Sequence, residues 1–389
     1  MYYLGLDFGT SGARAAIIDA TEQVVWSAQT IYTQAQSALS WREVLFWLLE
    51  QIPPALRTAV HGIAIDGTSG TALLTDDDFQ PVSPVLMYNH ALAGQATTKL
   101  AYLVKHAIQP RYLMHQVDYL NAQLTGMSGI SDYHNALKSG YDVRNMTWQA
   151  DMDSYAKLLP TIVAPGTTIA RLQRRVARHL NINANCMVHA GTTDSIAAFI
   201  AAGANQAGMA VTSLGSTMVL KLLSHQYIAS PQHGVYSHKY GDLWLAGGAS
   251  KTGGAVLRQF FTDAELVKYS AQIPVTQTSP YDYYPLPSMG ERFPIADPAR
   301  MPRLTPRPDD NVAFLHGLLD SMARIEQQGY AKLVELGADP LTQVLTAGGG
   351  SKNPQWRVLR ENYLAVPVSM AMRVDAACGS ALLAKRQTL

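Results

Sequence analysis

The sequence predicts an α/β protein with two related halves. Short apolar runs that end in glycine-rich turns alternate with segments of helical apolar spacing, which is the pattern of α/β folds. One hairpin pattern, a strand, a glycine with hydroxyl residues and a second strand, occurs at residues 4–17 and again at residues 210–220. The recurrence favours two related domains, although two tight hairpins of independent origin would look alike.

The first half is expected to open with an antiparallel meander, followed by a helix and a buried strand. Glycine and hydroxyl residues at 9–12 separate the first two apolar runs, which is typical of a hairpin turn. The helix has apolar residues at helical spacing and stops before two prolines. The expected strands are residues 2–6, 15–18, 24–28 and 61–66, and the expected helix is residues 41–50.

The second half continues the alternation. Prolines crowd residues 280–308, which excludes long helices and central strands from that stretch. Pro354 stands in the first turn of the last expected helix, a position that proline favours. Strands are expected at 186–190, 210–214, 217–220 and 341–347, and helices at 195–203, 311–336 and 353–364.

Composition excludes several classes of function. The 389 residues carry 30 Lys and Arg against 29 Asp and Glu, so the chain lacks the concentrated positive charge that nucleic-acid binding requires. Two cysteines cannot staple a chain of this size, which favours a reducing compartment. No basic leader precedes an apolar segment, and no apolar run reaches the about 18 residues that a membrane span needs. We therefore expect a cytoplasmic protein with neither nucleic acid nor membrane as partner.

Two glycine and hydroxyl turns are candidate phosphate sites. Turns of this composition point backbone N–H groups and hydroxyls toward a common point, which suits polyphosphate oxygens. Asp7 precedes the first turn, and a carboxylate beside a phosphate is a natural holder of Mg²⁺, usually through water. The alternative for Asp7 is that it only caps the turn. A second such turn at residues 213–217 favours a nucleotide site.

Asp194 is a candidate general base. It follows the turn residues at 191–193 and precedes an expected helix, so it would either cap that helix or accept a proton during phosphoryl transfer. The Gly-x-x-x-x-Gly-Lys-Ser/Thr loop, the Gly-x-Gly-x-x-Gly fingerprint and the Gly-x-Ser-x-Gly elbow are absent, which argues against the common ATPase, dehydrogenase and esterase motifs. Asp7 and Asp194, far apart in sequence, should meet at one site.

Five motifs in order resemble the FGGY family of carbohydrate kinases. Any one of them is common, but together they cover nearly the whole chain. They are LGLDFGTS at residues 4–11, GTTD at 191–194, SLGST at 213–217, GERFPIADP at 290–298 and TAGGGSKNPQW at 346–356.

The resemblance implies two actin-like, ribonuclease-H-like ATPase domains around a central cleft that holds ATP and a sugar. The implied domains are residues 1–201, with the sugar site and the catalytic base, and 202–374, with the nucleotide site; residues 375–389 would return to the first domain. It implies that Asp7 binds Mg²⁺ and that Asp194 is the base. ATP would be bound by Thr10, Ser11, Gly215, Ser216, Thr217, Gly349, Gly350, Asn353 and Trp356, with Thr10 near the transferred phosphoryl group.

For Trp356 the resemblance implies a place beside adenine, and an aromatic face next to a glycine turn can stack on a base. The alternative is that the indole packs on the inner face of its helix. Stacking on adenine needs an exposed ring face, whereas packing in the core buries the ring.

The sugar itself is indicated by a finer resemblance. Residues 63–71, 131–138 and 282–287 are similar to short cyanobacterial and plant-type pentulose kinases, which implies D-ribulose as substrate and D-xylulose as the nearest rival. Asp66 and Ser69, together with Asp7 and Asp194, would contact the sugar. The segment between Asn89 and Leu100, which would wall the sugar pocket, is shorter than expected for the family. A second hypothesis is a weak actin-like ATPase or nucleotide sensor. The residues indicate no oligomeric state.

Overall fold

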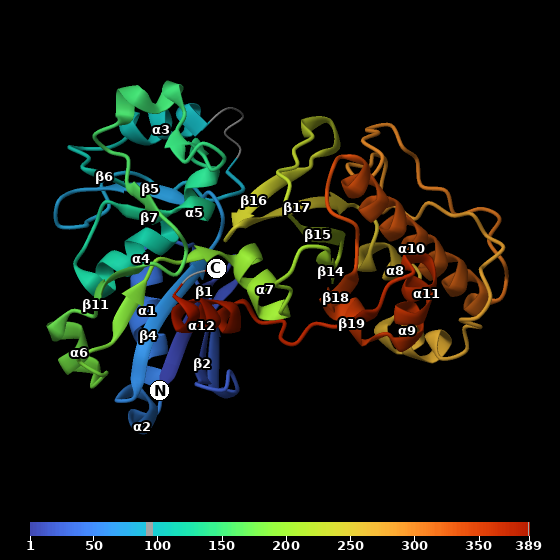
Figure 1. The fold of residues 1–389 in the computed structure, drawn as a ribbon, viewed down its shortest axis with the longest axis horizontal. Coiled ribbons are helices and arrows are strands. Elements are labelled where there is room, and N and C mark those ends of the chain that lie inside the picture. The colour runs from blue at the N-terminus through green and yellow to red at the C-terminus, as the bar shows by residue number, and fades with distance from the viewer. Residues whose placement is uncertain (91–95, 388) are drawn as a thin grey trace. The chain divides into compact units, whose positions relative to one another are not determined.

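The computed structural model describes residues 1–90, 96–387 and 389, and it contains two compact units (Figure 1). The first unit comprises Met1–Ala201 and Asp375–Leu389, and the second comprises Ala202–Val374. Part of the short segment expected to wall a sugar pocket, residues 91–95, lies outside the described residues. No helix in the described part of the chain is long and apolar enough to cross a membrane.

The first unit is built on a seven-stranded sheet. Its strand order is β11-β12-β4-β1-β2-β3, and β13 pairs with β4 outside this path. The expected meander is confirmed, because β1, β2 and β3 are antiparallel neighbours, and β4 runs parallel to β1. The strands are β1 Tyr2–Phe8, β2 Gly12–Asp19, β3 Val24–Ile31, β4 Val60–Gly67, β11 Thr168–Arg171, β12 Met187–His189 and β13 Thr192–Thr193.

Helices and short strands complete the first unit. Two-stranded pairs β5·β6, β7·β10 and β8·β9 lie outside the main sheet. The helices are α1 Ala38–Gln51, α2 Pro54–Arg57, α3 Ala96–Lys105, α4 Gln116–Thr125, α5 Tyr133–Leu137, α6 Arg174–Leu180, α7 Asp194–Ala202 and α12 Ala376–Arg386. The short strands are β5 Ala72–Thr75, β6 Tyr112–His115, β7 Ile130–Asp132, β8 Tyr141–Asp142, β9 Thr147–Trp148 and β10 Thr161–Val163, and a 3₁₀ helix spans Ala150–Tyr155.

Successive residues of β1 point to opposite faces of the sheet, and different helices pack on the two faces. Leu4 and Leu6 are fully buried in a core that includes Trp41 and Leu45 of α1. Gly5 points to the opposite face, where α12 packs against β1, β2 and β4 (Figure 1). A Cβ at Gly5 would lie 1.8 Å from the Ala377 carbonyl oxygen, so the helix rests directly on the strand backbone.

The second unit repeats this arrangement. Its sheet has the order β16-β17-β15-β14-β18-β19, in which β14, β15 and β17 are antiparallel neighbours and β18 runs parallel to β14. The hairpin β14·β15 therefore occupies the same place in its sheet as β1·β2 does in the first. The strands are β14 Met209–Leu214, β15 Met218–Ser224, β16 Tyr236–Tyr240, β17 Leu243–Ser250, β18 Gln343–Ala347 and β19 Val368–Met370.

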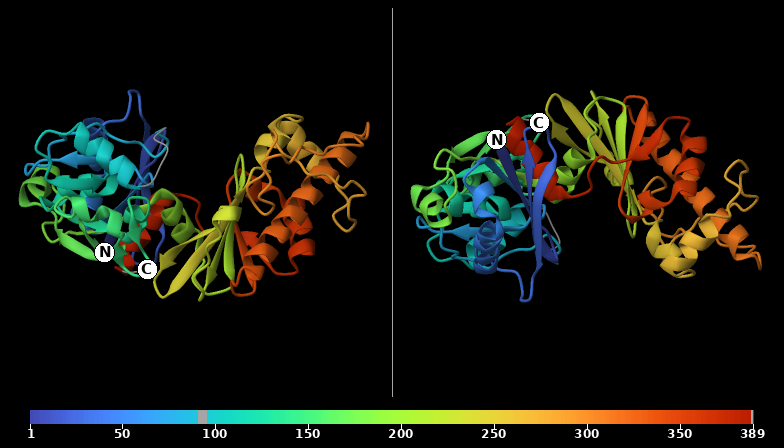
Figure 2. Two further views of the ribbon diagram at one scale, coloured as in Figure 1. Left: turned by 90° about the horizontal axis from the view of Figure 1, so that it is seen from above. Right: turned by 90° about the horizontal axis from the view of Figure 1, so that it is seen from below.

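Helices α10 and α11 cover one face of the second sheet (Figure 2). The long amphipathic helix expected at residues 311–336 is confirmed as α10, Asn311–Glu335, and the helix expected at 353–364 is α11, Pro354–Leu364. The remaining helices are α8 Gly254–Leu257 and α9 Asp263–Ser270, with 3₁₀ helices at Pro231–His233 and Gly349–Lys352.

A buried ion pair ties the two covering helices to the sheet. Arg360 of α11 makes two hydrogen bonds to the carboxylate of Glu326 of α10, and these side chains are at most 1% exposed. Glu326 also accepts from Thr212 of β14, and Arg360 donates to Thr346 of β18. Because β14 and β18 end in the two glycine turns, this network fixes the base of both turns.

The proline-rich stretch is an ordered excursion, as the sequence predicts. Residues 280–308 contain no helix and no strand of the main sheet, yet Tyr283 and Phe293 are fully buried. The Phe293 ring fills the space left by two glycines, since a Cβ at Gly248 or Gly329 would lie less than 3 Å from it. Proline content prevented regular structure here without preventing packing.

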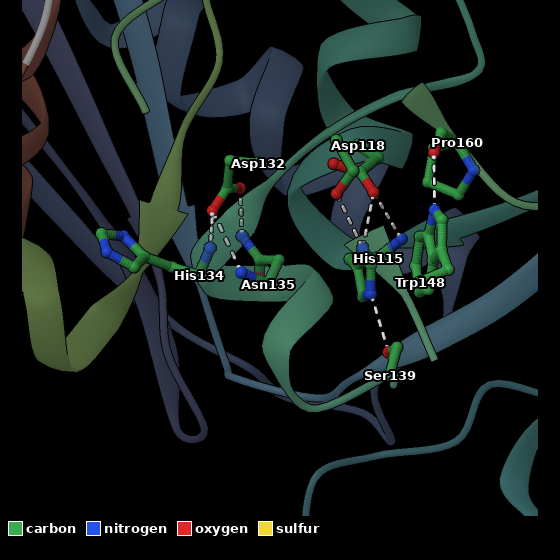
Figure 3. A network of polar contacts seen from close by, with 9 residues as sticks. His115, Asp118, Asp132, His134, Asn135, Ser139, Trp148 and Pro160 are labelled. Carbon is green, nitrogen blue, oxygen red and sulfur yellow. Dashed lines mark hydrogen bonds and ion pairs between the residues drawn. The ribbon is translucent and has the colours of Figure 1, made fainter. Parts of the chain in front are cut away.

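A polar network holds the region between β6 and α5 in the first unit (Figure 3). His115 is fully buried; its Nδ1 contacts Asp118 at 2.7 Å and Ser131 at 2.9 Å, and its Nε2 contacts Ser139 at 2.8 Å. Next to it, Asp132 caps α5 by accepting from the backbone N–H groups of residues 134 and 135. Burial and the neighbouring charge of Asp118 raise the pKa of Asp132 to about 7, although hydrogen bonds from Asn135 oppose the shift.

Replacement of Gly379 by alanine should destabilise the first unit. A Cβ at this position of α12 would lie 1.8 Å from the Ala197 carbonyl oxygen of α7, so backbone must move against backbone. We expect a loss of about 1–3 kcal/mol in unfolding free energy, the usual cost of overpacking. Gly349→Ala is the control, because a Cβ there meets nothing within 4 Å. Equal urea midpoints for the two variants would contradict the close contact.

Replacement of Asp132 by asparagine should flatten the dependence of stability on pH. A carboxyl with a raised pKa in the folded state stabilises the fold at low pH and loses that contribution as pH rises through about 7. Between pH 5 and pH 8 we expect the melting temperature of the wild type to fall by at least about 2 °C more than that of Asp132→Asn. Asn135 Oδ1 has no partner, so an amide flip would let it accept from the new side chain. Parallel curves would show that Asp132 is ionised throughout this range.

Candidate active site

Two carboxyl groups meet at the ends of β1 and β4. The parallel register places Asp7 directly beside Asp66, and the two carboxyl groups interact closely enough to share a hydrogen bond when one of them is protonated. Asp66 is fully buried, and its Oδ2 accepts a hydrogen bond of 2.6 Å from Ser380 of α12. Helix α12 therefore contacts this pair of carboxyl groups through Ser380.

Burial governs the electrostatics of the pair. It raises the pKa of Asp7 to about 6; the hydrogen bond from Asp66 and the charge of Arg14 oppose this rise, and the charges of Asp194 and Asp375 add to it. Arg14 lies 3.5 Å from Asp7 and is half exposed. Burial and the charge of Asp7 raise the pKa of Asp66 well above its usual range. Asp66 is thus the member that holds the proton, and Asp7 the one available as a carboxylate.

The structure corrects the role expected for Asp66. We expected this carboxyl to hydrogen-bond a sugar, but its side chain is 0% exposed and lies between Asp7 and Ser380. The reason is that β4 is an inner strand covered on both faces, so a residue before its end points into packed protein. Asp66 supports Asp7 instead of contacting a ligand.

Asp194 lies at the same edge of the sheet. It is the first residue of α7 and directly follows β13, which pairs in parallel with the end of β4. Its charge raises the pKa of both Asp7 and Asp66, so it lies close enough within the first unit to influence both. Its Oδ1 accepts from the Ser195 N–H at 2.6 Å, and the residue is only partly buried. The candidate base thus also contacts the backbone of the first turn of α7.

The first hairpin turn presents Thr10 and Ser11 to solvent. Both are exposed, while the turn backbone is held by a 3.0 Å hydrogen bond from Gly9 N to the Gly12 carbonyl. Gln36 adds a second restraint by donating to the Thr10 carbonyl at 2.5 Å. The turn is thus fixed at its base and open at its tip, as a phosphate-binding turn requires.

Several buried polar atoms near Asp194 have no hydrogen-bond partner in the structure. Besides Asp66 Oδ1, they are Ser69 Oγ, Gln116 Nε2, Asn135 Oδ1 and Thr193 Oγ1 within the described residues. They lie on segments that contact one another: Gln116 Oε1 accepts from the Thr68 N–H at 2.9 Å, and β13 packs against both β4 and α5. Unsatisfied buried polar atoms are rare and indicate a binding role or ordered water. Of the four besides Asp66, the sequence indicates a sugar-binding role for Ser69 alone. Thr193 and Asn135 lie in the motif at 191–194 and the segment at 131–138 without an assigned role, and Gln116 lies in neither.

The two glycine turns of the second unit lie at the ends of neighbouring strands. Gly215 and Ser216 are exposed, Thr217 is partly buried, and α8 holds this turn by a 2.9 Å bond from Gly254 N to the Gly215 carbonyl. Gly348 adopts a φ of 83°, and a Cβ there would lie 2.6 Å from the Leu214 carbonyl. Only glycine fits such a position. Of the next two residues, Gly349 is exposed to solvent and Gly350 is partly exposed.

The structure corrects the role expected for Trp356. Its side chain is 3% exposed and belongs to the core of the second unit, so neither face is available to stack on adenine. The indole instead packs beneath the turn, where a Cβ on Gly350 would lie 2.7 Å from it. Asn353 is also engaged: its Oδ1 caps α11 and its Nδ2 donates to Ser270 at 2.8 Å. Helical periodicity turns Trp356 inward because α11 buries that face.

The donor set fits a weakly held Mg²⁺. No group of three or more His, Cys, Asp or Glu side chains suited to a metal ion occurs within the described residues. Mg²⁺ retains several waters and is commonly held by one or two carboxylates together with substrate phosphates. Asp7, with Asp194 close by, supplies that number of carboxylates.

Comparison with known proteins shows what parts of this chain are similar to. Residues 210–388 match the model of the C-terminal domain of the FGGY family of carbohydrate kinases. A xylulose kinase of Klebsiella pneumoniae is 24% identical over 277 residues, which cover 60% of this chain and 57% of that protein. The chain thus spans a little over half the length of the first curated relatives that it matches.

Solved structures show the fold across the whole chain. The xylulose kinase of Rhodospirillum rubrum superposes with a TM-score of 0.84 at 20% identity, covering 99% of this chain and 89% of that one. The glycerol kinase of Plasmodium falciparum, solved with ADP, gives a TM-score of 0.82 at 15% identity, covering 99% and 89%. The two-domain actin-like α/β fold expected from the sequence is therefore confirmed. The family model thus matches the C-terminal part of the chain, and the relatives show sequence similarity to carbohydrate kinases over a little more than half of their length.

Proposed function

We propose that this protein is an ATP-dependent kinase that phosphorylates a ketopentose, with D-ribulose as the first candidate and D-xylulose as the second. The observation that carries the proposal is the placement of Asp194 at the same sheet edge as the buried pair of Asp7 and Asp66. A base next to an ionised carboxylate is what transfer of a phosphoryl group to a hydroxyl needs. The match of residues 210–388 to a carbohydrate kinase family model supports the same reaction.

Each group has a distinct role in this proposal. Asp194 accepts the proton of the attacking sugar hydroxyl, and Asp7 holds Mg²⁺ through water. When bound, Mg²⁺ neutralises charge on the phosphates. Thr10 and Ser11 bind phosphate oxygens at the first turn. Gly215, Ser216 and Thr217, with Gly349 and Gly350, bind the nucleotide in the second unit.

The preference for D-ribulose has its own support. Ser69 and Gly70 are small, and the unpartnered atoms of Ser69, Gln116 and Asn135 offer donors and acceptors for a polyhydroxylated ligand. Against this, the curated relatives reported above are xylulose kinases. Their alignments cover little more than half of each protein, so D-xylulose remains the rival substrate. A weak ATPase without efficient transfer is the third alternative.

The sugar panel is the first test. We expect ADP release from Mg·ATP to be stimulated most by D-ribulose, less by D-xylulose and least by L-ribulose and glycerol. The sequence resemblance gives the order of the first two sugars, and the polar atoms near Ser69 favour a ketopentose over glycerol. A coupled assay of ADP, with the sugar phosphate identified by mass, measures this. Stronger stimulation by D-xylulose than by D-ribulose would make D-xylulose the first candidate. ADP release that no sugar stimulates would favour the weak ATPase.

Removal of the proposed base should abolish transfer. Asp194→Asn keeps the size of the side chain and an oxygen that can accept from the Ser195 N–H, but the amide cannot take up the sugar's proton. We therefore expect kcat to fall by roughly 10²- to 10⁴-fold. Binding of ATP, measured by titration calorimetry, should change little. Asp78→Asn, which alters an exposed carboxyl in the loop after β5, is the matched control. Retention of more than about a tenth of the wild-type kcat would remove Asp194 from this role.

A further inference from the structure

The strand that directly precedes Asp194 is short and, among the described residues, pairs on one side only, with β4. β13 has only two residues, Thr192 and Thr193, and pairs with the end of β4. The residue before it, Gly191, lies directly against β4, since a Cβ there would be 1.8 Å from the Ile65 carbonyl oxygen. Backbone contacts therefore fix the β4 side of this segment, and its position on the other side depends on what packs there.

His134 of α5 packs on that other side. α5 and β13 are in contact, and His134 Nδ1 lies 2.7 Å from Thr192 Oγ1. Both side chains are 0% exposed, so no water competes for this hydrogen bond. The bond joins segments 58 residues apart in the sequence and ends two residues before the proposed base.

His134 is itself rigidly placed. Asp132 caps the N-terminus of α5, and its Oδ1 accepts the His134 N–H at 2.9 Å and the Asn135 N–H at 3.0 Å. Figure 3 shows the imidazole directed away from this cap. The ring also makes an edge contact with Tyr133, with centroids 4.8 Å apart. A capped helix and a buried ring give Thr192 a fixed partner.

We propose that His134 is a positioning residue that sets the location of Asp194 through Thr192. This inference rests on the proposed role of Asp194 as base. A hydrogen bond at Thr192 fixes the backbone from which the Asp194 carboxyl projects, and proton transfer requires that carboxyl within hydrogen-bond reach of the sugar hydroxyl. A displacement of about 1 Å can cost 10²-fold in rate.

A double-mutant cycle on kcat tests the proposal. His134→Phe and Thr192→Val each remove one partner of the hydrogen bond and replace it with an apolar side chain of similar shape. Each should lower kcat by roughly 10- to 100-fold. The KM for ATP should change less than about threefold. The double variant should be no slower than either single variant, because both remove the same hydrogen bond. His134→Asn places a polar atom where Nδ1 stands and should recover most of kcat. His225→Asn, on an exposed histidine of the second unit, is the control.

Hydrogen exchange supplies a readout that does not depend on sugar transfer. Amides of residues 191–197 should exchange faster in His134→Phe and in Thr192→Val than in the wild type, and at the wild-type rate in His134→Asn. Unchanged exchange, or multiplicative losses of kcat in the double variant, would overturn the positioning role. If the wild type transfers phosphate to no sugar but the exchange pattern appears, the proposed function fails and the structural coupling stands.

Discussion

The parallel register of β1 and β4 places two carboxyl groups side by side in the interior of the first unit, and the rest of the site is arranged around this constraint. Two adjacent buried carboxylates cannot both be ionised at low cost, so one proton stays on Asp66. The Ser380 hydroxyl of α12 donates to Asp66 Oδ2. That contact brings α12 against the backbone of β1, which explains the glycine at position 5, while the glycine at position 379 lets α12 pack against α7.

The second unit uses the same topology with a different stabilising contact. Its hairpin and its parallel strand meet at two glycine turns, but the buried charge beneath them is a paired one, Glu326 with Arg360. A buried pair with all its hydrogen bonds made specifies one arrangement of α10, α11 and the sheet. The first unit thus offers ionisable groups at its strand ends, and the second offers open backbone. This division suits a chemical step in one unit and nucleotide binding in the other.

The same backbone fold occurs in kinases named for different substrates. Structures with nearly the same backbone are a xylulose kinase in one case and a glycerol kinase in the other. Specificity in such folds depends on a few polar atoms at the site rather than on the backbone. In the function proposed here, those atoms are Ser69 Oγ, Gln116 Nε2, Asn135 Oδ1 and Thr193 Oγ1. These atoms are spread over β13, α4, α5 and the residues after β4, so no contiguous motif reports them.

The sequence by itself determined the order and type of most elements, because their signals are local. Apolar periodicity defines α10, Pro354 and Asn353 mark the start of α11, and glycine turns separate the strands of both hairpins. The same local signals picked out Asp7 and Asp194. Only the tertiary structure decided that Asp66 and Trp356 face inward, because burial depends on which helix covers a strand or turn. It also decided that Ser380 and His134 join the site, since each contacts a residue 314 or 58 positions away.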